Sequence, residues 1–201
     1  MSETSTVYVV DDDPAMRDSL RWLLESVDFQ VHIFESATAF LDQYKGHRPA
    51  CLVLDVRMPG MSGLDLQDEL VRRGVNIPMI MISAHGDVPV AVRALKTGAI
   101  DFIEKPFSDQ LLLDRVRQAL EKDQQASQTD EVKEAIRSRT ATLTPREKEV
   151  MELVVAGNPN KAVASQLGLS QKTVEIHRAR VMSKMSAGSL AELVRDSLML
   201  K

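Results

Sequence analysis

The sequence predicts an α/β domain with a doubly wound, five-stranded parallel sheet, followed by a small all-α domain. In residues 1–122, apolar runs of strand length alternate with segments of helical period, whereas residues 140–201 contain helical segments only. The charge changes at the same places: residues 1–122 hold 13 basic and 19 acidic side chains, net −6, and residues 140–201 hold 9 and 6, net +3. Residues 123–139, with 3 basic and 4 acidic side chains, are therefore predicted to be a linker between two cores.

In the first domain, five strands are expected to alternate with five helices. The expected strands cover residues 6–10, 29–34, 51–56, 77–83 and 99–105. The expected helices cover residues 14–27, 36–44, 63–74, 88–98 and 108–122. Gly74 and Gly98 are suited to end two of these helices, and Ser108 to begin the fifth. Such alternation implies right-handed crossovers and a sheet covered on both faces, with ligands bound at the carboxyl ends of the strands.

Chemically active side chains follow four of these strands. They are Asp11, Asp12 and Asp13 after the first strand, Asp55 at the end of the third, Ser83 at the end of the fourth and Lys105 at the end of the fifth. Adjacent carboxylates repel one another unless a cation lies among them, and hard oxygen ligands suit Mg²⁺. Asp55 could then act as a nucleophile toward a phosphoryl group, with Lys105 neutralising charge and Ser83 donating a hydrogen bond. Pro106 is expected to follow a cis peptide bond.

These motifs closely resemble the receiver domain of two-component response regulators, which has a flavodoxin-like fold. The matching segments are "VVDDDP", "LVLDVRMPGMSGLDL", "IMISAHGD" and "DFIEKPF". The resemblance implies that Asp55 accepts a phosphoryl group and that Mg²⁺ or Mn²⁺ is the cofactor. The implied metal ligands are Asp11, Asp12, Asp55 and the main-chain carbonyl of Arg57; the implied phosphoryl-contact and switch residues are Ser83, Lys105 and Phe102. Asp13 then begins a helix, and His85 lies where the family tunes the lifetime of the phosphoryl group.

The linker contains no glycine or proline, since none occurs between Pro106 and Pro145. Its residues are mostly good helix formers, with Val132, Ala135 and Ile136 spaced to form an apolar edge. We expect the fifth helix to continue through this segment as a semi-rigid rod. The polar composition also permits disorder.

The second domain begins with a helix-start motif: Thr144 as N-cap, Pro145 at the first helical position and Glu147 completing a capping box. A short helix, a turn at Gly168 and a second helix capped by Ser170 follow, which is the spacing of a helix-turn-helix. The side chains expected to form its core are Val163, Ala164, Leu167, Leu169, Val174, Val181 and Met185.

Residues 140–201 resemble the LuxR-type, or NarL-type, DNA-binding domain, and the whole chain is most similar to the FixJ subgroup of response regulators. The resemblance implies that Lys161, Thr173, His177 and Arg178 contact phosphates, and that Glu175, Ile176 and Ala179 face base edges. Lys172 and Lys184 are expected to face outward beside them. Apolar positions in the final helix, near "SLAELVRDSLML", could make a two-fold dimer contact.

Together the resemblances imply a transcriptional response regulator rather than an enzyme, beyond self-phosphorylation from small donors and autodephosphorylation. The expected partners are a sensor histidine kinase, double-stranded DNA with inverted-repeat half-sites, a second copy of the chain when phosphorylated, and RNA polymerase. A cytoplasmic location is expected, because the single Cys51 excludes an internal disulfide and no apolar run approaches a membrane span.

Three other interpretations stay open. The first is a DNA-binding protein that does not need phosphorylation. The second is an aspartyl-phosphate phosphatase of the haloacid dehalogenase type, which needs a second aspartate two residues after the nucleophile, where this chain has Arg57. The third is a flavodoxin-like cofactor carrier, whose phosphate three aspartates would repel.

Overall fold

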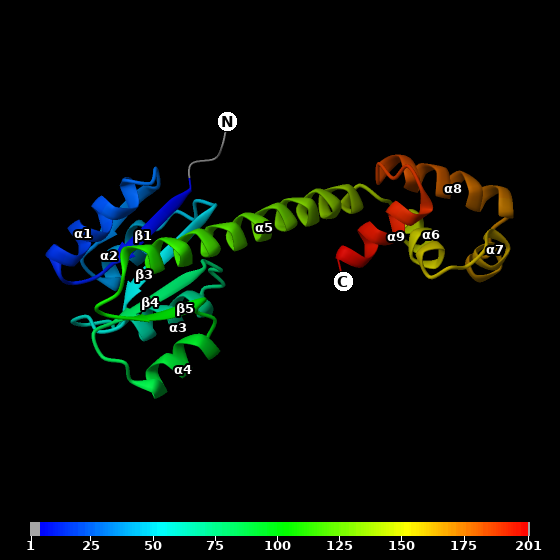
Figure 1. Ribbon diagram of the computed structural model, residues 1–201. Coiled ribbons are helices and arrows are strands. Elements are labelled where there is room, and N and C mark those ends of the chain that lie inside the picture. Colours follow the sequence, from blue (N-terminus) through cyan, green and yellow to red (C-terminus); the bar gives the residue numbers. More distant parts are fainter. Residues whose placement is uncertain (1–4, 201) are drawn as a thin grey trace. The chain divides into compact units, whose positions relative to one another are not determined.

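The computed structural model describes residues 5–200, which form two compact units, one up to Ser127 and one from Gln128 (Figure 1). The strands of the first unit are β1 Thr6–Val10, β2 Gln30–Phe34, β3 Ala50–Asp55, β4 Met79–Ser83 and β5 Asp101–Glu104. Within the described residues they form one five-stranded sheet in the order β2-β1-β3-β4-β5, and every pair is parallel. The predicted fold class is therefore confirmed.

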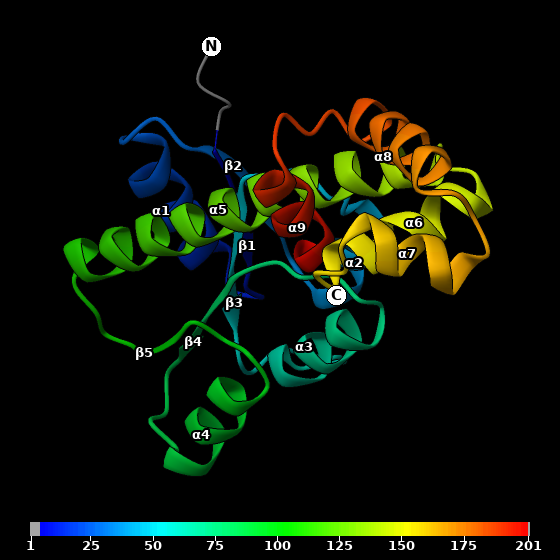
Figure 2. The same cartoon turned by 90° about the vertical axis from the view of Figure 1, so that its right-hand side faces the viewer.

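Helices cover both faces of this sheet (Figure 2). They are α1 Pro14–Glu25, α2 Ala37–Gln43, α3 Gly63–Arg72, α4 Val88–Lys96 and the first part of α5, Asp109–Ala141. One apolar core lies between the sheet and α2, α3 and α4, and a second lies between the sheet and α1 and α5. Because both faces are buried, β1, β3 and β4 consist almost entirely of buried residues.

Local signals at the helix ends act as the sequence predicts. Asp13 caps α1, and its Oδ1 atom accepts a hydrogen bond from the Ala15 amide at 2.9 Å. Gly74 and Gly98 follow α3 and α4 with φ of 69° and 110°, values that favour glycine. The Lys105–Pro106 peptide bond is cis, as expected.

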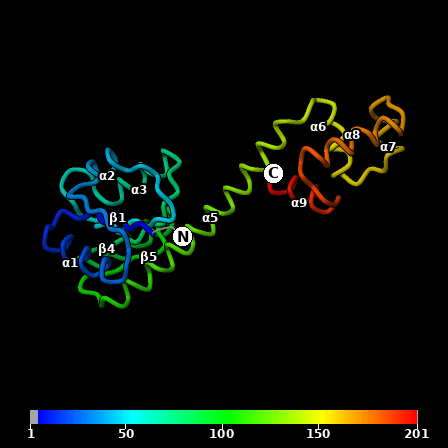
Figure 3. The backbone as a smooth tube through the Cα atoms, turned by 90° about the horizontal axis from the view of Figure 1, so that it is seen from above, coloured from blue at the N-terminus to red at the C-terminus, as the bar shows by residue number. Residues whose placement is uncertain are grey.

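Helix α5 is continuous from Asp109 to Ala141, as the tube in Figure 3 shows. Ser108 begins it, with its Oγ atom accepting from the Leu111 amide at 3.2 Å. Of the predicted apolar edge, Ile136 is fully buried in the core of the second unit, whereas Val132 is 46% exposed. The helix therefore runs through the segment that its composition assigned to the linker.

The second unit contains, besides the end of α5, the helices α6 Pro145–Val155, α7 Asn160–Leu167, α8 Gln171–Lys184 and α9 Leu190–Met199. Thr144 and Glu147 form the predicted capping box at the start of α6. Gly168 ends α7 in the left-handed conformation, with φ of 64°, and Ser170 caps α8. The predicted core residues are buried or packed against the core, so the helix-turn-helix is confirmed as a local structure. No helix among residues 5–200 is both long and apolar enough to cross a membrane.

Candidate functional site

Polar side chains from four strands meet at the carboxyl edge of the sheet, where the sequence predicts a site. They are Asp11 directly after β1, Asp55 at the end of β3, Ser83 at the end of β4 and Lys105 directly after β5. The parallel register brings these strand ends level, and the Lys105 amide donates to the Ser83 carbonyl at 2.8 Å. Residues up to 94 positions apart in the chain therefore share one edge of the sheet.

Lys105 is bound by two carboxylates at once. Its Nζ atom lies 2.6 Å from Asp55 Oδ1 and 2.9 Å from Asp11 Oδ2. Asp11 is 2% exposed and Asp55 6%, so both carboxylates are largely removed from water. One ammonium can balance only one of them, and the group has a net negative charge when both acids are ionised.

The pKa values reflect this imbalance. Burial raises the pKa of Asp55 above its ordinary value, which the hydrogen bond and charge of Lys105 offset only in part and the negative charge of Asp11 increases. Burial alone would lower the pKa of Lys105, but its hydrogen bonds to Asp55 and Asp11 outweigh that effect and raise it. Lys105 is thus firmly protonated, while the Asp55 carboxylate lacks full charge compensation.

The arrangement fits a hard divalent cation. Asp11 and Asp55 supply carboxylate oxygens, and the Arg57 amide donates to Asp55 Oδ2 at 2.7 Å, which places the Arg57 main chain beside them. Mg²⁺ typically takes one or two carboxylates together with water and other oxygen ligands. Asp12 is exposed, and no group of three His, Cys, Asp or Glu side chains among the described residues forms a complete metal-binding set.

Ser83 and Phe102 lie near this edge in different surroundings. The Ser83 hydroxyl donates to the His85 carbonyl at 2.9 Å and accepts from the His85 amide at 3.2 Å, so it is bonded to its own loop and not to Asp55. Phe102 is partly buried against the core on the α4 side of the sheet. His85 is exposed, and its main-chain carbonyl and amide are the groups that bond to the Ser83 hydroxyl.

Two contributors to this site were not predicted from the sequence. Gly63 begins α3 so close to β3 that a Cβ atom there would lie inside van der Waals contact of the Asp55 carbonyl oxygen. Arg17 on α1 reaches back, and its Nη1 atom donates to the Asp11 carbonyl at 2.7 Å. An unusual glycine at a helix start could have indicated Gly63, whereas the Arg17 contact depends on a rotamer and has no sequence signal.

In the second unit, the predicted base-facing residues Glu175, Ile176 and Ala179 share one face of α8 with Lys172, which was expected to face outward beside them. Lys172, Glu175, Ile176 and Ala179 have the spacing i, i+3, i+4 and i+7, and all four are exposed. Ile176 is 47% exposed, so it offers an apolar surface on this face of α8. Arg180 is also exposed on α8, directly after Ala179, and was not predicted from the sequence.

The other predicted DNA-contacting residues differ in their exposure to solvent and in the hydrogen bonds they already make. Lys161 on α7 is exposed, whereas Thr173 is half-buried and its Oγ1 atom lies 2.8 Å from Ser170 Oγ at the helix cap. His177 is half-buried, and its Nδ1 atom has no hydrogen-bond partner within the described part of the chain.

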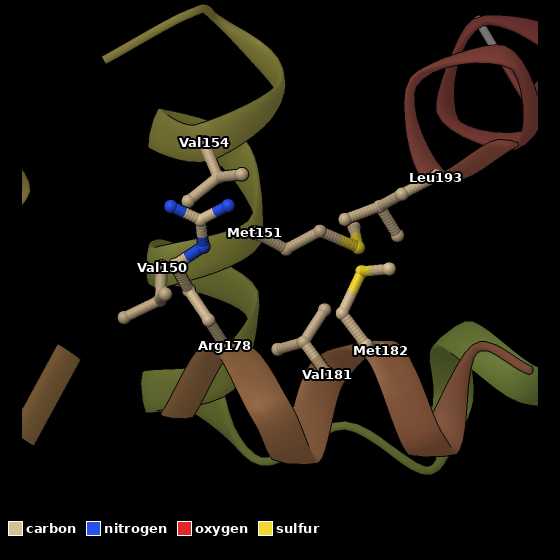
Figure 4. Close-up of a pocket in the computed structure, with 7 residues that line it drawn as sticks. All are labelled: Val150, Met151, Val154, Arg178, Val181, Met182 and Leu193. Atoms are coloured by element: carbon tan, nitrogen blue, oxygen red, sulfur yellow. The ribbon is translucent and has the colours of Figure 1, made fainter. Parts of the chain in front are cut away.

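Arg178 and Lys184 contact the domain itself. Figure 4 shows the Arg178 side chain rising from α8 along α6, beside Val150 and Val154, and its guanidinium group donates to Asn160 Oδ1. The cavity drawn there measures only about 10 Å³, so it is a packing gap and not a ligand site. Lys184 Nζ lies 2.7 Å from Glu147 Oε2 and 3.1 Å from the Thr142 carbonyl, so part of its hydrogen-bonding capacity is used inside the unit.

Comparison with known families agrees with both units. Residues 7–117 match the family described as the response regulator receiver domain, and residues 141–196 match the bacterial regulatory proteins of the luxR family. The receiver match covers more than half of the chain. It includes Asp11, Asp55, Ser83 and Lys105, which together form the acidic edge of the sheet.

Relatives match nearly the full length. The transcriptional regulatory protein FixJ of Bradyrhizobium diazoefficiens is 45% identical over 195 residues, covering 97% of this chain and 95% of that protein. The nodulation protein W of the same organism is 49% identical, covering 98% and 86%. Among solved structures, the response regulator StyR is 43% identical with a TM-score of 0.87, covering 98% of this chain and 99% of that one. Full-length FixJ from B. japonicum is 45% identical with a TM-score of 0.59, covering 97% and 96%. With a receiver domain followed by a LuxR-type DNA-binding domain, the chain belongs to the transcriptional response regulators of the FixJ subgroup.

Proposed function

We propose that this response regulator is switched by phosphorylation of Asp55. The observation that supports this most is the incomplete charge balance of the Asp55 carboxylate, which shares Lys105 with Asp11. An oxygen of Asp55 would attack the phosphorus of a phosphohistidine on a sensor kinase, or of a small acyl phosphate. The bond between phosphorus and the donor breaks, and the donor leaves with the electron pair.

Mg²⁺, or Mn²⁺ in its place, is the proposed cofactor of this step. Asp11, Asp55 and the main-chain carbonyl of Arg57 would hold it, and Asp12 would contribute from the exposed rim. When bound, the ion supplies positive charge for the transferring phosphoryl oxygens. Lys105 supplies a second positive charge from the protein itself, and its ammonium group is already within hydrogen-bond distance of Asp55.

The switch follows from competition for the Ser83 hydroxyl. A phosphoryl group on Asp55 offers strong acceptor oxygens, and to reach them Ser83 must give up its hydrogen bond to the His85 carbonyl. Movement of Ser83 leaves space beside Phe102, which is only partly buried. Repacking of Phe102 would then change the surface of α4 and β5. This surface change would lead to homodimerisation, or to release of the DNA-binding domain.

The proposed output is sequence-specific binding to promoter DNA with inverted-repeat half-sites, with RNA polymerase as a further partner. Glu175, Ile176 and Ala179 would face base edges from the exposed stripe of α8. The proposed backbone contacts are Lys161, Lys172, Thr173, His177, Arg178 and Lys184, of which Lys184 would need to share its ammonium with Glu147. Phosphate contacts set the register on DNA, and the base-facing residues select the sequence.

The experiment that tests this function measures mass by light scattering and DNA affinity on the same full-length sample. Beryllofluoride with Mg²⁺ mimics the phosphorylated aspartate, and the expected result is a dimer that binds DNA more tightly. The Asp55→Asn variant should stay unchanged by the same addition. Asp13→Asn is the matched control, because asparagine also caps a helix, and it should respond like the wild type.

A wild-type protein that changes neither mass nor DNA affinity would contradict the switch. That result, with intact DNA binding, would favour the phosphorylation-independent regulator instead. Catalytic turnover of an external phosphomonoester that disappears in Asp55→Asn would favour the phosphatase.

A further inference from the structure

An exposed ion pair ties the loop after β3 to the loop before α4, beside the proposed phosphorylation site. Arg57 Nη2 lies 2.6 Å from Asp87 Oδ2, and the two side chains are 57% and 53% exposed. Arg57 follows Asp55 by two residues, and its amide donates to Asp55 Oδ2 at 2.7 Å. The Arg57 side chain therefore leaves the main chain beside the Asp55 carboxylate, but its guanidinium group binds a different acid.

Asp87 occupies the N-cap position of α4 but does not act as a cap. Its backbone has the extended conformation that capping requires, with φ of −68° and ψ of 104°, yet its side chain makes no hydrogen bond to the first turn. The Val90 amide donates instead to the Asp87 carbonyl at 2.9 Å, and the Ala91 amide donates to the same oxygen at 3.0 Å. One carbonyl thus serves two amides of the first turn.

The other helices show that this start is unusual. In the part of the chain that the structure describes, the N-cap side chain accepts a hydrogen bond from the first turn in α1, α2, α3, α6, α8 and α9, and Ser108 does so for α5. Helix α7 resembles α4, but its N-cap residue is Pro159, which has no side-chain oxygen. The Ala162 and Val163 amides likewise share the Pro159 carbonyl, at 2.9 and 3.1 Å. Helix α4 therefore begins like a helix without a capping side chain, because Arg57 holds the carboxylate.

The first turn of α4 is weakly held by its other contacts. Val88 is 71% exposed, Pro89 is exposed, and Ala94 is the only buried residue among those that form this helix. A segment with few buried apolar contacts and exposed backbone hydrogen bonds opens easily. A hydrogen bond from a capping side chain should therefore make a measurable difference to the stability of this turn.

A phosphoryl group on Asp55 would compete with Asp87 for Arg57. Exposed ion pairs are weak, because water and salt screen the charges and the side chains lose freedom when they pair. A phosphoryl group carries more negative charge than a carboxylate, and a planar guanidinium group can bind two of its oxygens at once. The phosphoryl group is then the stronger partner for Arg57, and the Asp87 carboxylate is released.

We propose that Arg57 is a phosphoryl-binding residue that links Asp55 to the start of α4 by changing its partner. While Asp55 is unmodified, Arg57 holds Asp87, and α4 begins without a capping side chain. When the phosphoryl group is present, Arg57 turns to it and Asp87 becomes the cap of α4. The Val90 amide is the donor that Asp87 would use, since Pro89 before it has no amide hydrogen.

This exchange of partners rests on the proposed phosphorylation of Asp55, so the test uses the full-length protein with Mg²⁺ and with beryllofluoride added or withheld. Fluorine NMR measures the concentration of beryllofluoride that half-saturates the protein. Amide hydrogen exchange, followed by NMR, measures how readily the first turn of α4 opens at Val90. In the wild type, beryllofluoride should slow exchange at Val90 about fivefold, which corresponds to the usual contribution of a cap.

Arg57→Ala distinguishes this link from a purely structural ion pair. Without Arg57, Asp87 is free to cap α4, so exchange at Val90 should be slow even without beryllofluoride, whereas loss of a structural ion pair would make exchange faster. Beryllofluoride should bind to Arg57→Ala about tenfold more weakly, as expected for the loss of hydrogen bonds to a charged group. Exchange at Val90 that is unchanged or faster in this variant would overturn the proposal, as would an unchanged affinity for beryllofluoride.

Two substitutions of Asp87 test the cap itself. Asparagine caps a helix but carries no charge for Arg57, so Asp87→Asn should show slow exchange at Val90 with and without beryllofluoride. Alanine neither caps the helix nor pairs with Arg57, so Asp87→Ala should show fast exchange in both conditions. Identical exchange at Val90 in the two variants would mean that residue 87 does not cap α4, and the proposal would be wrong.

Arg93→Ala is the matched control. Arg93 lies on α4 and pairs with Asp68 of α3 at 2.6 Å, with exposures of 52% and 51%, so this pair resembles that of Arg57 and Asp87 in length and exposure. Its loss should change neither exchange at Val90 nor the affinity for beryllofluoride. Changes as large as those in Arg57→Ala would overturn the proposal, because any exposed ion pair of α4 would then have the same effect.

Mass and DNA affinity of the same samples separate failure of this link from failure of the phosphorylation switch. A wild-type protein that responds to beryllofluoride in mass and DNA affinity, but without slower exchange at Val90, would overturn the link alone. A wild-type protein that responds in none of these quantities would overturn both.

Discussion

Each of the two units buries a carboxylate beside a lysine, but the number of carboxylates per lysine differs between them. In the receiver, Asp11 and Asp55 share Lys105, and the pKa of Asp55 is raised. In the DNA-binding unit, Glu147 has Lys184 to itself at 2.7 Å and also accepts from the Thr144 amide at 2.9 Å. The hydrogen bond from Lys184, followed by that from Thr144, lowers the pKa of Glu147 to about 2.

This difference separates a reactive group from a structural one. Glu147 accepts hydrogen bonds from both the cap and the lysine, and one lysine balances its charge, so its carboxylate stabilises the start of α6. Asp55 has a hydrogen-bond partner at each oxygen but not enough positive charge around it. A pKa perturbed by burial and by a like charge is typical of functional sites. A bound cation could balance the charge of such a carboxylate, and a phosphoryl group could be transferred to it.

The largest effect is expected for Asp55→Asn, which should abolish labelling by acetyl phosphate. It also leaves Asp11 and Lys105 as a balanced pair, so the free energy of unfolding should not fall. Radiolabel transfer and urea unfolding measure the two effects. Residual labelling at the wild-type level would place the acceptor elsewhere, and a large loss of stability would mean that Asp55 is structural in the way Glu147 is.

The next largest effect is expected at Gly63, where the backbone of α3 touches the end of β3. In Gly63→Ala, the new Cβ atom would press on the Asp55 carbonyl and lie 3.0 Å from Val56 Cα, so strand or helix must shift. We expect a loss of about 3 kcal/mol in the free energy of unfolding, typical of overpacking against backbone. Slower labelling of Asp55 should accompany it.

Gly188→Ala in the DNA-binding unit is the matched control. There the nearest atom to an added Cβ is the Glu192 carboxylate at 3.3 Å, the end of a flexible side chain. The cost should stay below about 1 kcal/mol. Equal costs at the two glycines would show that the close approach at Asp55 is readily relieved.

The architecture and the acidic edge could be predicted because both depend on patterns along the chain. Strand-length apolar runs place Asp11, Asp55 and Lys105 at strand ends, and the parallel topology then brings those ends together whatever the side-chain details. Helix caps such as Asp13 and Thr144 are equally local.

Contacts between distant segments could not be predicted in the same way. Asp123 lies in the segment assigned to the linker, yet it is 2% exposed, pairs with Arg48 at 2.8 Å and accepts from the Ala50 amide at 2.9 Å. Its 75-residue separation from Arg48 leaves no periodic signal in the sequence. The bond between Ser83 and the His85 main chain depends on a rotamer, which the sequence pattern does not determine.

In the DNA-binding unit, substitutions of two α8 residues should distinguish contacts to the DNA backbone from contacts to the bases. Arg178→Ala is expected to weaken binding to all DNA sequences about equally and to reduce the salt dependence by about one phosphate contact. Glu175→Gln should instead change preference at one base pair by about 1–3 kcal/mol, since a carboxylate accepts from a cytosine amino group. Binding titrations on an operator panel at several salt concentrations measure both. A sequence-selective loss in Arg178→Ala would assign that residue to a base.

The smallest effect, and the one that defines the structural carboxylate, is the acid dependence of Glu147. Its pKa of about 2 in the folded protein lies below the ordinary value of 4.5, so the unfolded chain takes up the proton first as the pH falls. The stabilisation from Glu147 is therefore complete above about pH 4.5 and is lost progressively toward pH 2. Glu147→Gln lacks this contribution, so the variant should be less stable than the wild type at neutral pH, and the two stability curves should converge in acid. Urea unfolding of both proteins across this range measures the convergence, with Glu149→Gln as control because Glu149 is an exposed residue of the same helix. If the free energies of unfolding of Glu147→Gln and the wild type ran parallel across this pH range, the charge of Glu147 would not stabilise the folded protein. Glu147 would then resemble Asp55, a buried carboxylate whose charge is not fully compensated.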